Sequence, residues 1–202
     1  MRTALCVVSV FVWSVPVEAQ TIPAAALKYK RALIGNARLV WGLDAPVSLI
    51  ASQVHQESGW NPNAKSAYAN GLSQFTPASS KWLSELFPNE LGDNQPFEPS
   101  WALRAVARFD FWLWERATYA ANKCSRASVM LAAYNGGEGW VARDRKLAAS
   151  KGKDSTKWFG HVELYSSRAA WAFKENRQYV KRIIKDIQPM YIKAGWGIGV
   201  LC

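Results

Sequence analysis

Residues 47–64 read VSLIASQVHQESGWNPNA, an apolar helical pattern that runs into a turn containing glycine and proline. Apolar residues recur in it every three to four positions, which is the period of one helix face. Glu57 occupies the next position of that face, where another apolar residue would continue the pattern. The sequence therefore predicts a carboxylate on the buried edge of a helix, near its C-terminal end. The apolar face consists of Val47, Ile50, Ala51 and Val54.

Two effects raise the expected pKa of Glu57. The partial negative charge at a helix C-terminus disfavours a further anion, and burial beside apolar groups disfavours it again. A carboxyl group that stays protonated near neutral pH is what general acid catalysis requires. The alternative interpretation is structural: a helix-end carboxylate that neighbouring amides satisfy.

A second carboxylate, Glu175, is expected at the start of the final clear helix, which should end before Pro189. Glu175 shares one face of this helix with Tyr179, Ile183 and Ile187. At a helix N-terminus the dipole stabilises an anion. Two inward carboxylates at opposite kinds of helix end would have separated pKa values, giving one proton donor and one hydrogen-bond acceptor.

The remaining sequence predicts one mainly α-helical domain, because helical periodicity dominates and no two-residue alternation is sustained. A first helix is expected at about residues 24–41. Asp44 is expected to cap the Glu57 helix, Ser100 to open the longest helix, and Ser125 to cap another that stops at Gly136.

Two segments are expected to lack regular helix. Residues 61–77 are rich in Asn, Ser, Ala and Gly, and have room for a small β-hairpin. Residues 143–157 are Lys-rich and are interpreted as a mobile surface loop. Of the 11 tryptophans most are expected in the core, while Trp60, beside Glu57, is expected in a cleft.

Four motifs follow one another along the chain. They are ESGWNPNA at 57–64, GLSQFTP at 71–77, AAYNGG at 132–137 and ENRQYV at 175–180. In this order they closely resemble the motifs of the soluble lytic transglycosylase family. The resemblance implies a lysozyme-like fold of the goose type and an enzyme that cuts peptidoglycan glycan strands without a cofactor.

The resemblance also implies roles for individual residues. Glu57 would be the single catalytic acid and base, assisted by Ser58 through a hydrogen bond. Glu175 would hold the N-acetyl side of the substrate. The other residues implied to bind substrate are Ser73, Gln74 and Thr76 at the sugar subsites, Tyr134 and Asn135 closing over the reacting sugar, and Tyr179.

The sequence departs from the family pattern at a few positions. Ser73 and Phe75 stand where methionine and an aliphatic residue are commoner, and Gly137 replaces a usual alanine. The loop at 66–71 is one residue short. These departures concern the subsites and leave the catalytic glutamate in place.

The 202 residues suffice for one domain, and the formal net charge is +10. This excess favours polyanionic partners such as nucleic acid, acidic polysaccharide or cell envelope. No aromatic or Gly-rich nucleic-acid-binding motif is apparent, so no nucleic acid is expected as partner. With two histidines and no metal-binding spacing, a metal-free mechanism is expected.

The N-terminus resembles an export signal. Arg2 precedes an apolar run from Ala4 to Val15, and small residues precede Gln20. We therefore expect a signal peptide at residues 1–19 and a catalytic domain at 20–202, exported to the periplasm or the medium. A second interpretation keeps the apolar run as an uncleaved anchor. After cleavage the chain is expected to be a monomer without stable membrane insertion.

Cys124 and Cys202 would both reach an oxidising compartment, where they are expected to form a disulfide.

Two rival functions stay open. A lysozyme-type hydrolase would need a second carboxylate to direct water, for which Asp93 and Glu98 are candidates. A catalytically silent peptidoglycan-binding protein would not need Glu57.

Overall fold

A computed structural model describes residues 21–202, so the expected signal peptide lies outside the described residues. This part of the chain is helical, as predicted, and no strand is assigned in it. Among the described residues no helix is long and apolar enough to cross a bilayer. The elements are α1 (Ala24–Trp41), α2 (Val47–Ser58), α3 (Pro77–Leu86), α4 (Pro88–Leu91), α5 (Pro99–Arg116), α6 (Lys123–Gly136), α7 (Glu138–Ser150), the 3₁₀ turn η1 (Val162–Leu164), α8 (Ala170–Lys181), the π-helical segment η2 (Arg182–Ile187) and α9 (Gln188–Lys193).

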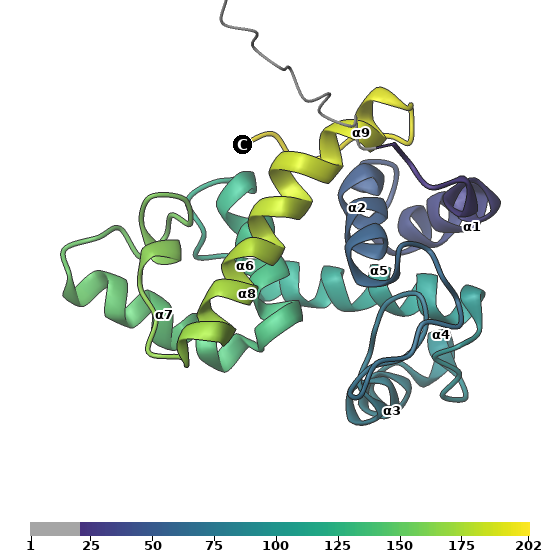
Figure 1. Cartoon of the computed structure of the whole chain (residues 1–202), viewed down its shortest axis with the longest axis horizontal. Coiled ribbons are helices and arrows are strands. Elements are labelled where there is room, and N and C mark those ends of the chain that lie inside the picture. Colours follow the sequence, from purple (N-terminus) through teal and green to yellow (C-terminus); the bar gives the residue numbers. More distant parts are fainter. Residues whose placement is uncertain (1–20) are drawn as a thin grey trace, which may run out of the picture.

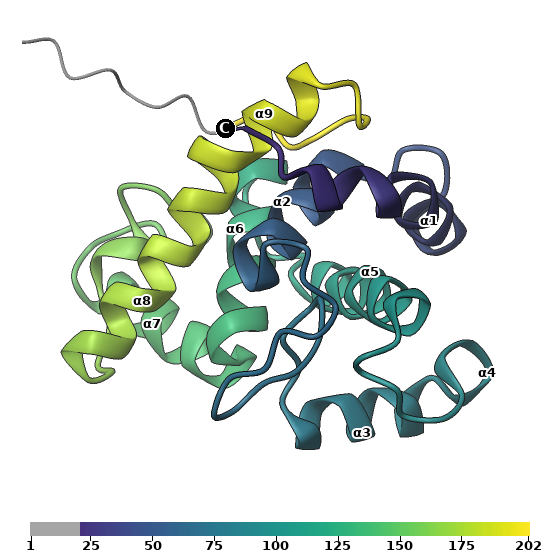
Figure 2. The ribbon, with the colours of Figure 1, turned by 45° about the vertical axis from the view of Figure 1, so that its right-hand side comes forward.

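The long helix α5 crosses the middle of the molecule and joins two groups of helices (Figure 1). α1 packs against α5 on one side, and α6 packs against it on the other. The continuous α8–η2–α9 rod crosses the face of the molecule and contacts both α2 and α6 (Figures 1 and 2). α2 and α8, which carry the two predicted carboxylates, are thereby brought together.

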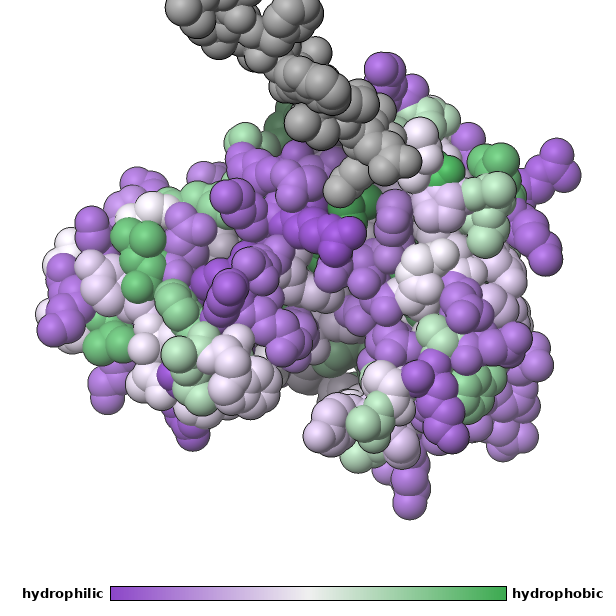
Figure 3. Space-filling view, in the orientation of Figure 1, coloured by the Kyte–Doolittle hydropathy of each residue, from purple (hydrophilic) through white to green (hydrophobic). Residues whose placement is uncertain are grey.

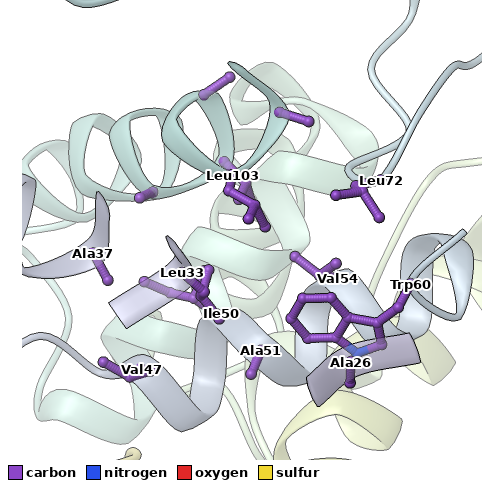
Figure 4. Packing of buried hydrophobic residues seen from close by; sticks show 14 of the residues in the cluster. Ala26, Leu33, Ala37, Val47, Ile50, Ala51, Val54, Trp60, Leu72 and Leu103 are labelled. Atoms are coloured by element: carbon purple, nitrogen blue, oxygen red, sulfur yellow. The ribbon is translucent and has the colours of Figure 1, made fainter. Parts of the chain in front are cut away.

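Buried apolar residues form two adjoining clusters. One joins α1, α2, α5 and the C-terminal segment and includes Leu33, Val54, Trp60, Leu72 and Leu103 (Figure 4). The other joins α6, α7, α8 and η2. The apolar face predicted for α2 therefore packs into the first cluster, as its spacing requires.

The helix α2 begins at Val47, and Asp44 does not cap it. Hydrogen-bond donors in its first turn are satisfied instead by carbonyl groups of the C-terminal tail. The backbone amide of Ser48 donates to the Ile198 carbonyl at 3.0 Å, and the Ser48 hydroxyl donates to the Gly197 carbonyl at 2.6 Å. Because these partners lie about 150 positions away, local sequence rules point to the wrong cap.

The predicted start of α6, with Ser125 as its cap, was also wrong by a few residues. The cap is Asn122, whose side-chain oxygen accepts from the backbone amide of Ser125 at 2.8 Å, and the helix begins at Lys123. Asparagine is as good an N-cap as serine. The predicted end at Gly136 is confirmed.

The Lys-rich segment 143–157 is not a mobile loop in its first half, which belongs to α7. Asp144 is fully buried there and pairs with Arg177 of α8 at 2.8 Å, while Arg145 donates to the Ser155 carbonyl. These contacts hold the segment against the rest of the domain.

The hairpin between residues 61 and 77 is reduced to two isolated bridges, Lys65 with Asn70 and Asn70 with Phe75.

The last helix starts at Ala170 and continues through Pro189, so both of its predicted ends were wrong. A π-helical segment, Arg182–Ile187, precedes the proline. Its wider turn lets the chain pass Pro189, which lacks an amide hydrogen, without stopping the rod. Glu175 therefore lies in the middle of α8, and the argument from the helix N-terminus does not apply to it.

The expected disulfide between Cys124 and Cys202 is present. It joins the C-terminal tail to the first turn of α6.

Candidate functional site

Glu57 lies at the end of α2 on the wall of a cleft of about 580 Å³. α8 forms the opposite wall, with Glu175, Gln178 and Tyr179, and Asn135 at the end of α6 closes one side. The space-filling view shows a hollow between the two halves of the molecule, with hydrophilic side chains gathered beside it (Figure 3). Four predicted site residues, Glu57, Asn135, Glu175 and Tyr179, thus share one cleft.

The Glu57 carboxyl accepts a hydrogen bond from the Tyr179 hydroxyl at 2.5 Å. Burial raises the pKa of Glu57 from its ordinary value of 4.5 to about 8, with a smaller upward contribution from Glu175. The Tyr179 bond opposes this rise, because it stabilises the ionised form. Glu57 is thus a carboxylic acid that is protonated at neutral pH, as its predicted burial beside apolar groups requires.

Asn135 and Glu175 are held together by a short polar chain. The side-chain amide of Asn135 donates to Glu175 Oε1 at 3.5 Å, and its oxygen accepts from Asn176 at 2.8 Å. Asn176 is buried and also donates to the Ala132 carbonyl. This chain fixes the amide of Asn135 beside the cleft and links α6 to α8.

Tyr134 lies deeper, and its hydroxyl donates to the Ser73 carbonyl at 2.7 Å. Its ring packs against Phe75 and Phe109. Burial raises the pKa of Tyr134 well above its ordinary value. Tyr134 thus links α6 to the 71–77 segment.

The other predicted substrate-binding side chains form hydrogen bonds within the protein itself. The Ser58 hydroxyl donates to the Val54 carbonyl at 3.3 Å and not to Glu57. Ser73 is fully buried and donates to the Ala102 carbonyl. Gln74 donates to the carbonyls of Ala64 and Gly71, while the Thr76 side chain caps α3.

The 71–77 segment has an unusual backbone. Gln74 adopts a positive φ of 46°, which non-glycine residues rarely do. A Cβ atom at Gly71 would lie 1.9 Å from the Pro96 carbonyl oxygen, so only glycine fits there. Strained positions of this kind gather at functional sites.

Trp60 is not a cleft residue. It is fully buried, and its indole nitrogen donates to the Tyr191 hydroxyl at 2.6 Å. Its ring packs against Tyr29 and Trp196. The expectation failed because the residues that cover Trp60 come from two distant parts of the chain, α1 and the C-terminal segment.

Several cleft residues were missed in the sequence. α8 and η2 also contribute Lys181, Arg182 and Asp186, and Gln56 comes from α2. The helical spacing that continues from Glu175 and Tyr179 is a signal that could have found Arg182 and Asp186.

The carboxylates expected to direct water do not line this cleft. Asp93 borders a separate hollow between α4 and α5, and Glu98 directly precedes α5. The carboxylates that share the cleft with Glu57 are Glu175 and Asp186. Within residues 21–202, no three His, Cys, Asp or Glu side chains are grouped so that they could hold a metal ion.

Comparison with known proteins agrees with the motifs. The family model described as "Transglycosylase SLT domain" matches residues 41–157. The chain is 31% identical over 110 residues to the membrane-bound lytic murein transglycosylase F of Shewanella pealeana, covering 54% of this chain and 21% of the relative. It is 30% identical to the protein of that name from Shewanella sediminis, covering 73% of this chain and 31% of the relative. The chain thus spans less than a third of the length of these relatives.

Solved structures have the same fold. The lytic transglycosylase Slt of Pseudomonas aeruginosa superposes with a TM-score of 0.60 at 22% identity, covering 87% of this chain and 26% of that one. The 70 kDa soluble lytic transglycosylase of Escherichia coli gives a TM-score of 0.55 at 21% identity, covering 80% of this chain and 24% of that one. Since the family model covers more than half of the chain and spans the helix that carries Glu57, the chain belongs to the transglycosylase SLT domain family.

Proposed function

We propose that this chain is a peptidoglycan lytic transglycosylase that cleaves the MurNAc-GlcNAc β-1,4 bond and leaves 1,6-anhydro-MurNAc ends. The observation that carries the proposal is the environment of Glu57, a carboxyl with a pKa of about 8 in an open cleft. Peptidoglycan glycan strands are the proposed partner, and the chain needs no cofactor.

Protonated Glu57 donates its proton to the glycosidic oxygen as the bond to the anomeric carbon breaks. The Tyr179 hydroxyl, 2.5 Å from Glu57 Oε1, stabilises the carboxylate that this step creates. Glu57 then takes the proton from the sugar's own 6-hydroxyl, whose oxygen bonds to the anomeric carbon. One carbon–oxygen bond breaks and another forms, the acid is regenerated, and no water is consumed.

The 6-hydroxyl is favoured over water because it is tethered to the reacting ring, which gives it a high effective concentration. Glu175 is proposed to hold the N-acetyl side of the substrate and Asn135 to close over the reacting sugar, since both line the cleft and contact each other. Gln74, Thr76 and Ser73 are proposed to shape the sugar subsites by fixing the strained segment.

Export fits this activity. Residues 1–19 are proposed to be a signal peptide that is removed before Gln20, and the enzyme is proposed to act as a monomer at the cell wall. The Cys124–Cys202 disulfide supports a periplasmic or extracellular location, because such bonds persist in oxidising compartments. Intact-mass analysis of the secreted protein tests the cleavage site, and recovery of only the full chain would favour the retained anchor.

A hydrolase is the second candidate, because Glu175 and Asp186 share the cleft and either could direct water to the reacting carbon. Digestion of purified sacculi, with product analysis by mass spectrometry, separates the two reactions. Fragments ending in 1,6-anhydro-MurNAc that resist borohydride reduction support the transglycosylase. Reducing, water-added ends as the main product would refute it, and their loss in D186N or E175Q would identify the water-directing carboxylate.

The E57Q variant provides the control for this digestion. It should release no fragments, because an amide neither donates nor recovers the proton. Equal release by the wild type and E57Q would remove Glu57 from the mechanism. Binding to sacculi without any release by the wild type would indicate a catalytically silent protein.

A further inference from the structure

Two aspartates, Asp110 and Asp144, are fully buried, in very different surroundings. Asp144 pairs with Arg177 at 2.8 Å and Arg168 at 3.4 Å, and accepts from the Ser166 hydroxyl. These partners are those of an ionised carboxylate. Asp110, in the middle of α5, has no such partners, and the mechanism above makes no use of it.

The hydrogen-bond partner of Asp110 is Gln53, which is also fully buried. The side-chain amide of Gln53 donates to Asp110 Oδ1 at 3.2 Å. The other oxygens of the pair, Asp110 Oδ2 and Gln53 Oε1, are both buried and lack a hydrogen-bond partner. Two unpartnered acceptors on one contacting pair would be costly if Asp110 were ionised, whereas one proton between them would satisfy both.

The charges around the pair favour that proton. The titratable groups that influence Asp110 electrostatically, or are influenced by it, are Glu57 on α2, Tyr134 on α6 and Tyr179 on α8. All of them are neutral or anionic. Burial accordingly raises the pKa of Asp110 well above its ordinary value; the Gln53 hydrogen bond opposes this rise, and Glu57 adds to it.

We propose that Asp110 is a neutral acid that donates to Gln53 Oε1, closing a two-bond acid–amide ring, and that this ring positions the Glu57 helix for catalysis. Gln53 lies one helical turn before Glu57 on α2, so the ring fixes α2 to α5 close to the reacting group. Its neutrality also keeps a second buried anion away from Glu57. Asp110 is a positioning residue, since it acts through α2.

The two aspartates give opposite expectations for the same substitution. Asn in place of Asp110 can make the same ring permanently, because its amide donates to Gln53 Oε1 and its oxygen accepts from Gln53 Nε2. Asn in place of Asp144 leaves buried arginines without their counter-ion. At pH 5 the melting temperature of D110N should therefore lie at or a few degrees above the wild-type value, and that of D144N should be lower by on the order of 10 °C.

The pH dependence of stability tests the protonation state directly. An acid whose pKa is raised by folding stabilises the fold at low pH, and this stability is lost as the pH rises from the unfolded value toward the folded one. Glu57 has the same sign, so the comparison is made between E57Q and E57Q/D110N. The difference in Tm, double variant minus E57Q, should increase by roughly 3–5 °C for each pH unit between pH 5 and pH 8. A Tm difference that does not change with pH would show that Asp110 is already ionised and overturn the proposal.

The positioning role is tested by activity on solubilised glycan strands, and this test alone rests on the proposed function. D110N should retain kcat within about twofold with an unchanged alkaline limb of the pH profile. D110L, which cannot form the ring, should lower kcat by about tenfold or more and change KM little. The positioning role would be refuted by an unchanged kcat in D110L, or by a kcat in D110N as low as in D110L. A shift of the alkaline limb of D110N to lower pH would also refute it.

The two tests fail independently. If D110L does not fold, the stability comparison and the D110N profile still decide the outcome. If the wild type does not cleave glycan strands, the proposed function fails, while the pH dependence of Tm still reports on the Asp110–Gln53 ring.

Discussion

Replacing Glu57 with Gln should stabilise the folded protein while abolishing its activity. The variant keeps a side-chain oxygen that can accept from Tyr179, so the main change is the loss of an ionisable group. In the wild type, folding raises the pKa of Glu57 from 4.5 to about 8. Each pKa unit is worth about 1.4 kcal/mol, so this shift of 3.5 units costs the folded state about 5 kcal/mol once the pH exceeds 8.

The direction of this pH effect on stability follows from how many protons the folded and unfolded states bind. Below pH 4.5 the protonated acid is present in both the folded and unfolded states, and Glu57 imposes no cost. Between pH 4.5 and about 8 the unfolded state releases its proton while the folded state keeps it, so the wild type loses stability as the pH rises. E57Q lacks this loss, and its advantage in Tm should reach roughly 10 °C at pH 8–9.

The measurement is Tm, or urea unfolding, for wild type and variant at unit steps from pH 5 to pH 9. E115Q, which removes the same charge from an exposed position on α5, controls for the change in net charge. Parallel curves for wild type and E57Q would refute the claim that burial keeps Glu57 protonated. Activity of the wild type should fall as the pH rises through about 8, since the first step needs the protonated acid.

The remaining predictions concern the neighbours of Glu57 and the disulfide. Y179F removes the bond that lowers the pKa of Glu57, so the alkaline limb of its pH–rate profile should move to higher pH while kcat falls; a limb at lower pH would contradict this. E175Q should raise KM and slow the enzyme without changing the anhydro product, as mass spectrometry of the fragments would show. Replacing Cys124 and Cys202 by serine should lower the free energy of unfolding by about 4 kcal/mol, judged from the 78-residue separation; urea curves that coincide would contradict it.

What could be predicted from the sequence was mostly local. The spacing of the α2 apolar face places Glu57 at the buried end of that helix, and Gly59, with φ of 58°, ends it as expected. What could not be predicted depends on distant partners. Trp60 is buried because distant aromatic residues cover its ring, and Tyr191, 131 positions away, accepts its indole hydrogen.

The errors in α7 and α8 have a common physical cause. Segment 143–157 has the composition of a loop, yet Asp144 anchors its helical half by pairing with Arg177. α8 starts five residues before Glu175, at Ala170, without any side-chain cap. Composition and capping rules do not register a helix that is fixed by tertiary contacts, and so they placed Glu175 at a helix end.

The acidity of Glu57 is therefore a product of two distant parts of the chain. α2 supplies the carboxyl, but the C-terminal region holds this helix at both ends: Tyr179 bonds to Glu57 at one end, and the carbonyls of Gly197 and Ile198 accept from Ser48 at the other. All three C-terminal residues lie beyond the segment that the family model matches. The matched segment thus carries the acid, while residues outside it restrain its position and act on its pKa in both directions, Tyr179 lowering it and Glu175 raising it. Because of this division, the sequence can place Glu57 at the buried end of α2, whereas the hydrogen bond and the second carboxylate that adjust its pKa appear only in the folded chain.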